Sequence, residues 1–141
     1  MLKVVLDTNI IVSALLKADS LPDLILSMAI EKQLALCVSP AIFEEYQEVL
    51  AREKFKKLEQ KSVKRFLSVL KQRSLWIEPR VTVDVIKNDP ADNKFLECAL
   101  AVQADFLITG NVRHFPPKAF HETRIVTPRE FIAFIAELLT E

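Results

Sequence analysis

Short apolar runs alternate along the chain with longer stretches in which apolar residues recur every three or four positions. The clearest runs span residues 3–6, 34–38, 106–109 and 124–126. Runs of this length are typical of buried β-strands, whereas the longer period predicts amphipathic helices. Strands that alternate with helices predict an α/β fold with a central, mainly parallel sheet covered on both faces.

Capping signals mark where several helices begin. Ser20 with Asp23, and Thr127 with Glu130, have the spacing of a capping box. Serine before proline at residues 39–40 and aspartate before proline at 89–90 place a cap and an N1 proline in front of two more helices. The expected helices span about 9–17, 21–33, 40–51, 59–73, 90–103 and from 128 onward. Residues 75–77 predict a further short strand, and residues 80–88 carry no clear pattern.

The composition fits one cytoplasmic domain over residues 1–141. Half of the residues are hydrophobic and 27% are charged, so the chain can bury an ordinary core. No apolar run is long enough to span a bilayer, and the N-terminus lacks the pattern of a secretory signal. The two cysteines lie in apolar segments without paired-ligand spacing, which is typical of buried, reduced thiols.

The glycine and histidine content excludes several classes of enzyme. Gly110 is the single glycine, whereas phosphate-binding and dinucleotide-binding loops need several glycines at fixed spacing. His114 and His121 lack the i, i+4 spacing of a zinc-protease pair.

Candidate chemistry begins at Asp7, which directly follows the first strand. In parallel α/β sheets, ligands bind outside the carboxyl ends of the strands. A helix that leads into the next strand begins at this same edge. Asp92 lies in the first turn of such a helix, on its apolar side, whereas Lys94 and Glu97 are expected to point the other way.

The helix from residue 40 offers a third carboxylate. Glu45 lies at the margin of its apolar side and can reach the sheet edge, whereas Glu44 and Glu48 are expected on a solvated face. Asp92 has a structural alternative as the acid of a capping box with Asp89. Asp105 precedes its strand, so we expect a structural role for it at the opposite edge.

Carboxylates that gather at one edge repel each other unless a cation neutralises them, and Mg²⁺ or Mn²⁺ prefers such oxygen ligands. We therefore expect a metal at Asp7, Glu45 and Asp92. Asn111 follows a later strand and offers an amide oxygen at the same edge. Thr8, Asn9 and Thr109 can hydrogen-bond the carboxylates and orient them.

Positive charge is concentrated in residues 52–73, which hold nine basic and two acidic residues, while the remaining chain has a net charge of −7. A basic segment beside an acidic centre suits a polyanion such as RNA that must approach the metal. The alternative is a solvated helical face. The candidate RNA-binding residues are Lys54, Lys56, Lys57 and Lys61.

These motifs, in this order, resemble the PIN domain family, close to its bacterial and archaeal toxins of toxin–antitoxin systems. The resemblance rests on Val5–Asn9, Ser39–Leu50, Asp89–Leu96 and Ala104–Asn111 and extends over nearly the whole chain. It implies a three-layer α/β/α sandwich and a metal-dependent endoribonuclease with catalytic acids at Asp7, Glu45 and Asp92. Relatives often have a fourth acid at the position of Asn111.

The resemblance also implies a homodimer or higher homo-oligomer and a small antitoxin protein as partner. Two other functions stay open from the sequence. One is an RNA-binding or scaffold domain with a weakened metal site, which Asn111 favours. The other is an aspartate-nucleophile phosphatase, although that chemistry normally needs an acid where Asn9 stands.

Overall fold

The computed structural model describes residues 1–140, and for Glu53 it describes the main chain only. Its strands are β1 (Lys3–Leu6), β2 (Ala35–Val38), β3 (Leu75–Trp76), β4 (Phe106–Ile108), β5 (Ala119–Phe120) and β6 (Thr123–Val126). Its α-helices are α1 (Thr8–Leu16), α2 (Leu21–Ile30), α3 (Pro40–Leu50), α4 (Gln60–Arg73), α5 (Asn93–Val102) and α6 (Pro128–Thr140). Short 3₁₀ turns lie at η1 (Glu53–Phe55), η2 (Pro90–Asp92) and η3 (Val112–His114).

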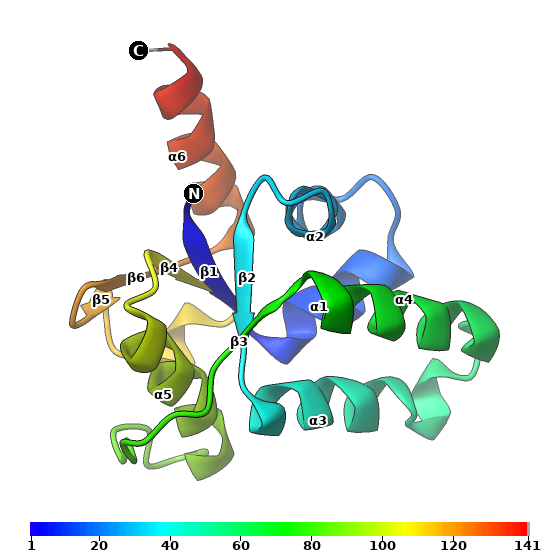
Figure 1. Cartoon of the computed structure of the whole chain (residues 1–141), viewed down its shortest axis with the longest axis horizontal. Helices are drawn as coiled ribbons and strands as arrows, with labels where there is room; N and C mark the ends of the chain where they lie inside the picture. The colour runs from blue at the N-terminus through cyan, green and yellow to red at the C-terminus, as the bar shows by residue number, and fades with distance from the viewer. Residues whose placement is uncertain (141) are drawn as a thin grey trace.

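The strands form one mixed sheet in the order β3-β2-β1-β4-β6-β5. All neighbouring strands are parallel except β5, which pairs antiparallel with β6. In Figure 1, α5 lies to the left of β1 and β2, and α1, α2 and α4 lie to their right. The predicted α/β class, with a mainly parallel sheet flanked by helices, is therefore confirmed.

The core explains why short apolar runs became strands. Val4, Val5 and Leu6 of β1 have no exposed surface, and β4 is buried along its whole length. Phe106 of β4 packs edge-on against Phe131 of α6, with ring centroids 5.2 Å apart. Central strands covered on both faces need continuous apolar sequence, as these runs provide.

The predicted caps are confirmed at three helices and wrong at one. Ser39 accepts a hydrogen bond from the Ile42 amide, and Ser20 accepts one from Asp23. Thr127 and Glu130 form the reciprocal pair of a full capping box. Asp89 makes no side-chain capping bond, and the segment that follows it begins with the 3₁₀ turn η2 rather than with an α-helix.

Two features at the far side of the sheet complete the fold. Asp105 accepts a hydrogen bond from the Lys3 amide at 2.9 Å, which confirms its predicted structural place at the amino ends of the strands. The two-residue strand β5 was not predicted, because so short an edge strand leaves no periodic signal.

No helix within residues 1–140 has both the length and the apolar character needed to cross a bilayer.

Candidate active site

The strand order places one pair of strand ends at a topological switch point. From β1 the chain adds β2 and β3 on one side, and it then returns to add β4 and β6 on the other. In open α/β sheets, ligands bind in the crevice outside the carboxyl ends at such a point. Asp7 follows β1 and Thr109 follows β4, so these two residues meet there.

Asp7 is held in a buried and electrostatically unfavourable position. Its carboxylate, in a residue only 9% exposed, accepts a hydrogen bond of 2.7 Å from the hydroxyl of the buried Thr109. Burial raises the pKa of Asp7, the negative charge of Glu45 raises it further, and the hydrogen bonds from Thr109 and from the main chain of Asn9 and Thr8 act in the opposite direction. A nearby cation would therefore stabilise the charged form of Asp7.

Helix α3 brings Glu45 to the same place. Tyr46 is completely buried, and its hydroxyl donates a hydrogen bond of 2.6 Å to the carbonyl oxygen of Leu6, the last residue of β1. That bond fixes the helix against the strand that carries Asp7. Glu45 is half-buried at this edge, whereas Glu44 is exposed, so the helical phase is as predicted.

Asp92 enters the site from η2. It is partly exposed, and its pKa is raised to about 6, mainly by burial and then by the negative charges of Asp7, Asp89 and Glu45. An electrostatic interaction with His114 lowers the pKa of Asp92. These mutual effects place the carboxylates of Asp7, Glu45 and Asp92 within electrostatic reach of each other.

Lys94 is a site residue that the sequence analysis placed wrongly. Its ammonium group donates a hydrogen bond of 2.6 Å to Glu45, and both side chains are only 20% exposed. Glu97, also predicted to point away, accepts a hydrogen bond from the main chain of Val83. The apolar side of α5 is buried as predicted, at Phe95, Leu96 and Ala99, so the helical phase is right. Lys94 nevertheless contacts Glu45 because its side chain is long enough to reach from its own helix to α3.

The second carboxylate oxygen of Glu45 accepts a hydrogen bond from the hydroxyl of Thr8. Both oxygens of Glu45 therefore have partners. Within residues 1–140, no group of three or more His, Cys, Asp or Glu side chains is drawn together closely enough to hold a metal as they lie. Coordination by all three acids would require Glu45 to exchange its contact with Lys94.

The donor set nevertheless suits a hard divalent cation in its chemistry. The groups at this edge are carboxylate, hydroxyl and amide oxygens, and Mg²⁺ is bound through one or two carboxylates with waters and substrate phosphates completing its shell. Burial is the largest cause of the raised pKa of both Asp7 and Asp92, and a bound cation would favour their charged forms. Two protein carboxylates are enough for such an ion.

Gly110 lies beside both asparagines proposed for the site. Asn111 is half-buried, and its main-chain N–H donates a hydrogen bond to the hydroxyl of Thr109. Asn9 is exposed, and its side-chain amide lies 3.9 Å from where a Cβ on Gly110 would stand. Asn9 reaches Asp7 through its main chain.

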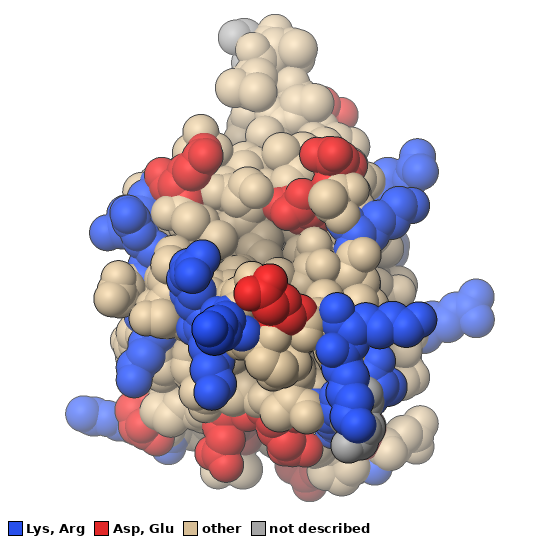
Figure 2. Space-filling view, turned by 90° about the vertical axis from the view of Figure 1, so that its right-hand side faces the viewer, with Lys and Arg blue, Asp and Glu red and all other residues tan. Residues whose placement is uncertain are grey.

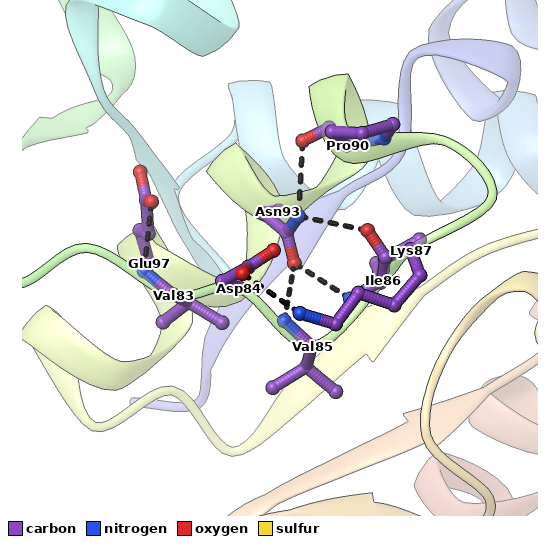
Figure 3. A network of polar contacts seen from close by, with 8 residues as sticks. All are labelled: Val83, Asp84, Val85, Ile86, Lys87, Pro90, Asn93 and Glu97. Atoms are coloured by element: carbon purple, nitrogen blue, oxygen red, sulfur yellow. Dashed lines mark hydrogen bonds and ion pairs between the residues drawn. The ribbon is translucent and has the colours of Figure 1, made fainter.

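Asn93 is a functional candidate that the sequence analysis missed. This buried amide accepts hydrogen bonds from the amides of Val85 and Ile86 and donates to the carbonyl oxygens of Ile86 and Pro90 (Figure 3). It thus fixes the loop before α5 directly beside Asp92. The only sequence signal was a polar residue within the apolar side of a helix.

The basic stretch approaches the site through its first residues. Lys54 and Phe55 line a hollow of about 270 Å³ together with Asp7, Thr8 and Asn9. The other candidate RNA-binding side chains, Lys56, Lys57 and Lys61, are exposed beyond that hollow. Figure 2 views the end of the molecule where α3 connects to α4, and it shows Lys and Arg side chains on both sides of a central acidic patch.

Comparison with known proteins agrees with this architecture. The sequence profile of the PIN domain matches residues 3–113, which contain all of the candidate carboxylates. The chain is also 28% identical, over an alignment of 142 residues, to Uncharacterized protein MJ1680 of Methanocaldococcus jannaschii. That alignment covers 93% of this chain and 90% of the archaeal protein. Because the profile spans most of its length, this chain belongs to the PIN domain family, whose members are generally nucleases.

Proposed function

We propose that this protein is a Mg²⁺- or Mn²⁺-dependent endoribonuclease that hydrolyses RNA phosphodiester bonds. The observation that carries the proposal is that Asp7, Glu45 and Asp92, from three separate elements, act electrostatically on one another near the switch point of the sheet. Buried carboxylates that repel each other destabilise a fold. Binding of a cation and of substrate would offset this repulsion and gives these carboxylates a function.

In this proposal Asp7 and Asp92 hold the metal, with Glu45 and the amide oxygen of Asn111 completing the site. The bound cation would supply an activated water and neutralise negative charge on the phosphodiester. Thr109 and the main chain of Asn9 orient Asp7, and Thr8 orients Glu45. Lys94, released from Glu45, would be free to pair with a phosphate oxygen.

The proposed substrate is RNA, guided by the basic stretch. Lys54 already lines a hollow that reaches Asp7, and Lys57 and Lys61 extend positive charge away from it. Backbone phosphates supply most of the affinity of such proteins, irrespective of sequence. A single nuclease domain over residues 1–141 would suffice for this activity.

We also propose a cellular role as the toxin of a toxin–antitoxin pair, acting in the cytoplasm as a homo-oligomer. Its support is the resemblance of the motifs to that branch of the family. A small gene directly beside this one, whose product binds the protein and blocks RNA cleavage, is the expected partner. If co-expression of the neighbouring gene product left cleavage unchanged, the toxin role would be abandoned and the nuclease would stand.

A second candidate function is an RNA-binding domain without catalysis. The contact between Lys94 and Glu45 favours it, because an internal cation already neutralises one of the acids. The neutral Asn111, where relatives often have an acid, points the same way. This candidate predicts RNA binding that neither metal nor chelator changes.

The decisive experiment is cleavage of a labelled single-stranded RNA by purified protein with Mg²⁺, with Mn²⁺ and with EDTA. We expect cleavage with either metal and none with EDTA. Glu45→Gln should slow cleavage severely, whereas the matched variant Glu44→Gln, one residue away on the exposed face, should act like wild type. Metal-independent cleavage, or equal effects of the two variants, would refute the proposed site. RNA binding without cleavage in any metal would favour the second candidate.

A further inference from the structure

A cavity of about 630 Å³ opens close to Asp92, at the loop that leads into η2. One wall is formed by residues 85–89 and the other by residues 113–117. It shares no lining residue with the hollow at Asp7 and Lys54. It adjoins the site, because the main-chain amide of Asp92 donates a hydrogen bond of 3.0 Å to the carbonyl oxygen of Asp89 in the first wall, and His114 of the second wall interacts electrostatically with Asp92.

The first wall is held rigidly by the side chain of Asn93. This amide binds the main chain of Val85 and Ile86, and Glu97 binds the amide of Val83 just before them (Figure 3). Ile86 and Val83 are buried, so they anchor the loop to the core. The cavity is therefore largely preformed, as ligand sites usually are.

The second wall follows β4 through η3. The amides of His114 and Phe115 donate hydrogen bonds to the carbonyl oxygens of Asn111 and Val112, which fold this segment into a tight turn. Phe115 is buried against Phe95 of α5, with ring centroids 6.4 Å apart. With Phe115 anchored in the core, Arg113 and His114 are left exposed at the rim.

The lining combines the groups that recognise a nucleotide. Arg113 offers a planar cation that can bind a phosphate or stack on a base. His114 offers an aromatic ring on which a base can also stack. Val85, 47% exposed, supplies apolar surface, and Asn88 and Asp89 supply hydrogen-bonding groups for a base edge. Two cations line the cavity: Lys87 in the first wall, whose ammonium group also contacts Asp84, and Arg113 in the second wall. The volume lies within the roughly 300–1,000 Å³ typical of small-molecule sites.

We propose that this cavity binds one nucleotide of the RNA strand next to the phosphodiester that is cut, with Arg113 as its principal contact. The inference rests on the proposed nuclease function for its substrate and goes beyond it in naming a second binding site. The basic stretch and the cavity adjoin different carboxylates, Asp7 and Asp92. An RNA strand held at both would cross the acidic centre between them.

The test measures binding of a short fluorescent single-stranded RNA in an Asp7→Asn background, so that cleavage does not interfere. Adding Arg113→Gln should raise the Kd about tenfold, in the range expected for loss of one stacked or phosphate-bound nucleotide. Arg124→Gln is the matched control, because this exposed arginine is the second residue of β6, at the opposite edge of the sheet. It should leave the Kd unchanged. A 4-thiouridine RNA should crosslink to residues 85–89 or 113–117.

The outcomes separate this inference from the proposed function. Normal Kd for Arg113→Gln, with no crosslink to either wall, overturns the nucleotide site even if the wild-type protein cleaves RNA. Loss of binding for Arg113→Gln in a protein that never cleaves RNA supports the nucleotide site and refutes the nuclease. If Arg113→Gln and Arg124→Gln weaken binding equally, the effect is one of net charge and the cavity has no special role.

Discussion

The two edges of the sheet each carry an aspartate beside a central strand, in opposite circumstances. Asp105, before β4, is exposed and accepts the amide hydrogen of Lys3 at 2.9 Å. Asp7, after β1, is buried, and its pKa is raised by burial and by the neighbouring charge of Glu45. The amino edge thus uses a carboxylate to complete the hydrogen bonding of the sheet. At the carboxyl edge, burial and Glu45 disfavour the charged form of Asp7, and a bound cation would offset that unfavourable free energy.

The largest expected difference between the edges is in catalysis. Asp7→Asn should reduce RNA cleavage by more than about a hundredfold, because even groups that only orient metal ligands are worth about 10–100-fold. Asp105→Asn should cleave at the wild-type rate. Thermal unfolding with Mn²⁺ provides a second measurement, since a ligand that binds only the folded state raises Tm. If Asp7→Asn kept the full metal-induced rise, Asp7 would not be a ligand.

The second largest difference between the two edges should be in their contribution to RNA affinity. Replacing Lys54, Lys56, Lys57 and Lys61 with Gln should raise the Kd by roughly tenfold and flatten its salt dependence by about 0.7 per lost phosphate contact. All RNA sequences should be affected alike, and cleavage at saturating RNA should survive. Lys32→Gln with Arg124→Gln removes exposed positive charge at the amino edge and should leave the salt slope intact. An unchanged slope in the four-lysine variant would assign those lysines to a solvated face.

A smaller effect should follow from adding charge to the carboxyl edge. Asn111→Asp would create the fourth acid that relatives often have, so metal affinity should increase severalfold and cleavage should be at least as fast. Isothermal titration with Mn²⁺ measures the affinity directly. A folded variant with unchanged affinity would indicate that this side chain does not face the metal.

The smallest expected effect concerns pH and stability in the metal-free protein. The folded-state pKa of Asp92, about 6, lies above its ordinary value of 3.8, so folding favours the protonated form. The destabilisation by Asp92 is therefore absent at low pH, grows between these two values and is complete above about 6. Asp92→Asn should raise Tm by a few degrees at pH 7.5 and hardly at all near pH 3.5. Asp105→Asn should instead lower Tm slightly. A fall in Tm for both variants would contradict the proposal that the carboxylate at the carboxyl edge destabilises the metal-free fold.

The sequence predicted every strand except β5, and all six α-helices, because each of these elements has its own local signal. Buried central strands need apolar runs, and the caps at residues 39 and 127 are local hydrogen-bonding motifs. The convergence of Asp7, Glu45 and Asp92 could be predicted in outline, since parallel topology converts position in the chain into position at an edge.

The parts that could not be predicted depend on contacts between distant segments. Lys94 lies on the site because its long side chain reaches from α5 to Glu45 of α3, a contact between helices that are far apart in the sequence. Asn93 is buried because a loop without periodicity folds onto it. The cavity at Arg113 exists only where that loop faces η3, and no single segment encodes such a meeting.

The contacts of Asn93 have a practical consequence for redesigning this protein. The side chain of Asn93 hydrogen-bonds only to main-chain atoms of the loop, so these bonds do not depend on which side chains the loop carries. Four exposed positions, at residues 84, 85, 87 and 88, can therefore be randomised as a library while Ile86 and Asn93 are kept. Proline is the one residue to exclude at position 85, because the donated amide hydrogen would be lost. If the cavity binds a nucleotide as proposed, this loop is a place where RNA preference can be changed while Asp7, Glu45 and Asp92 are kept.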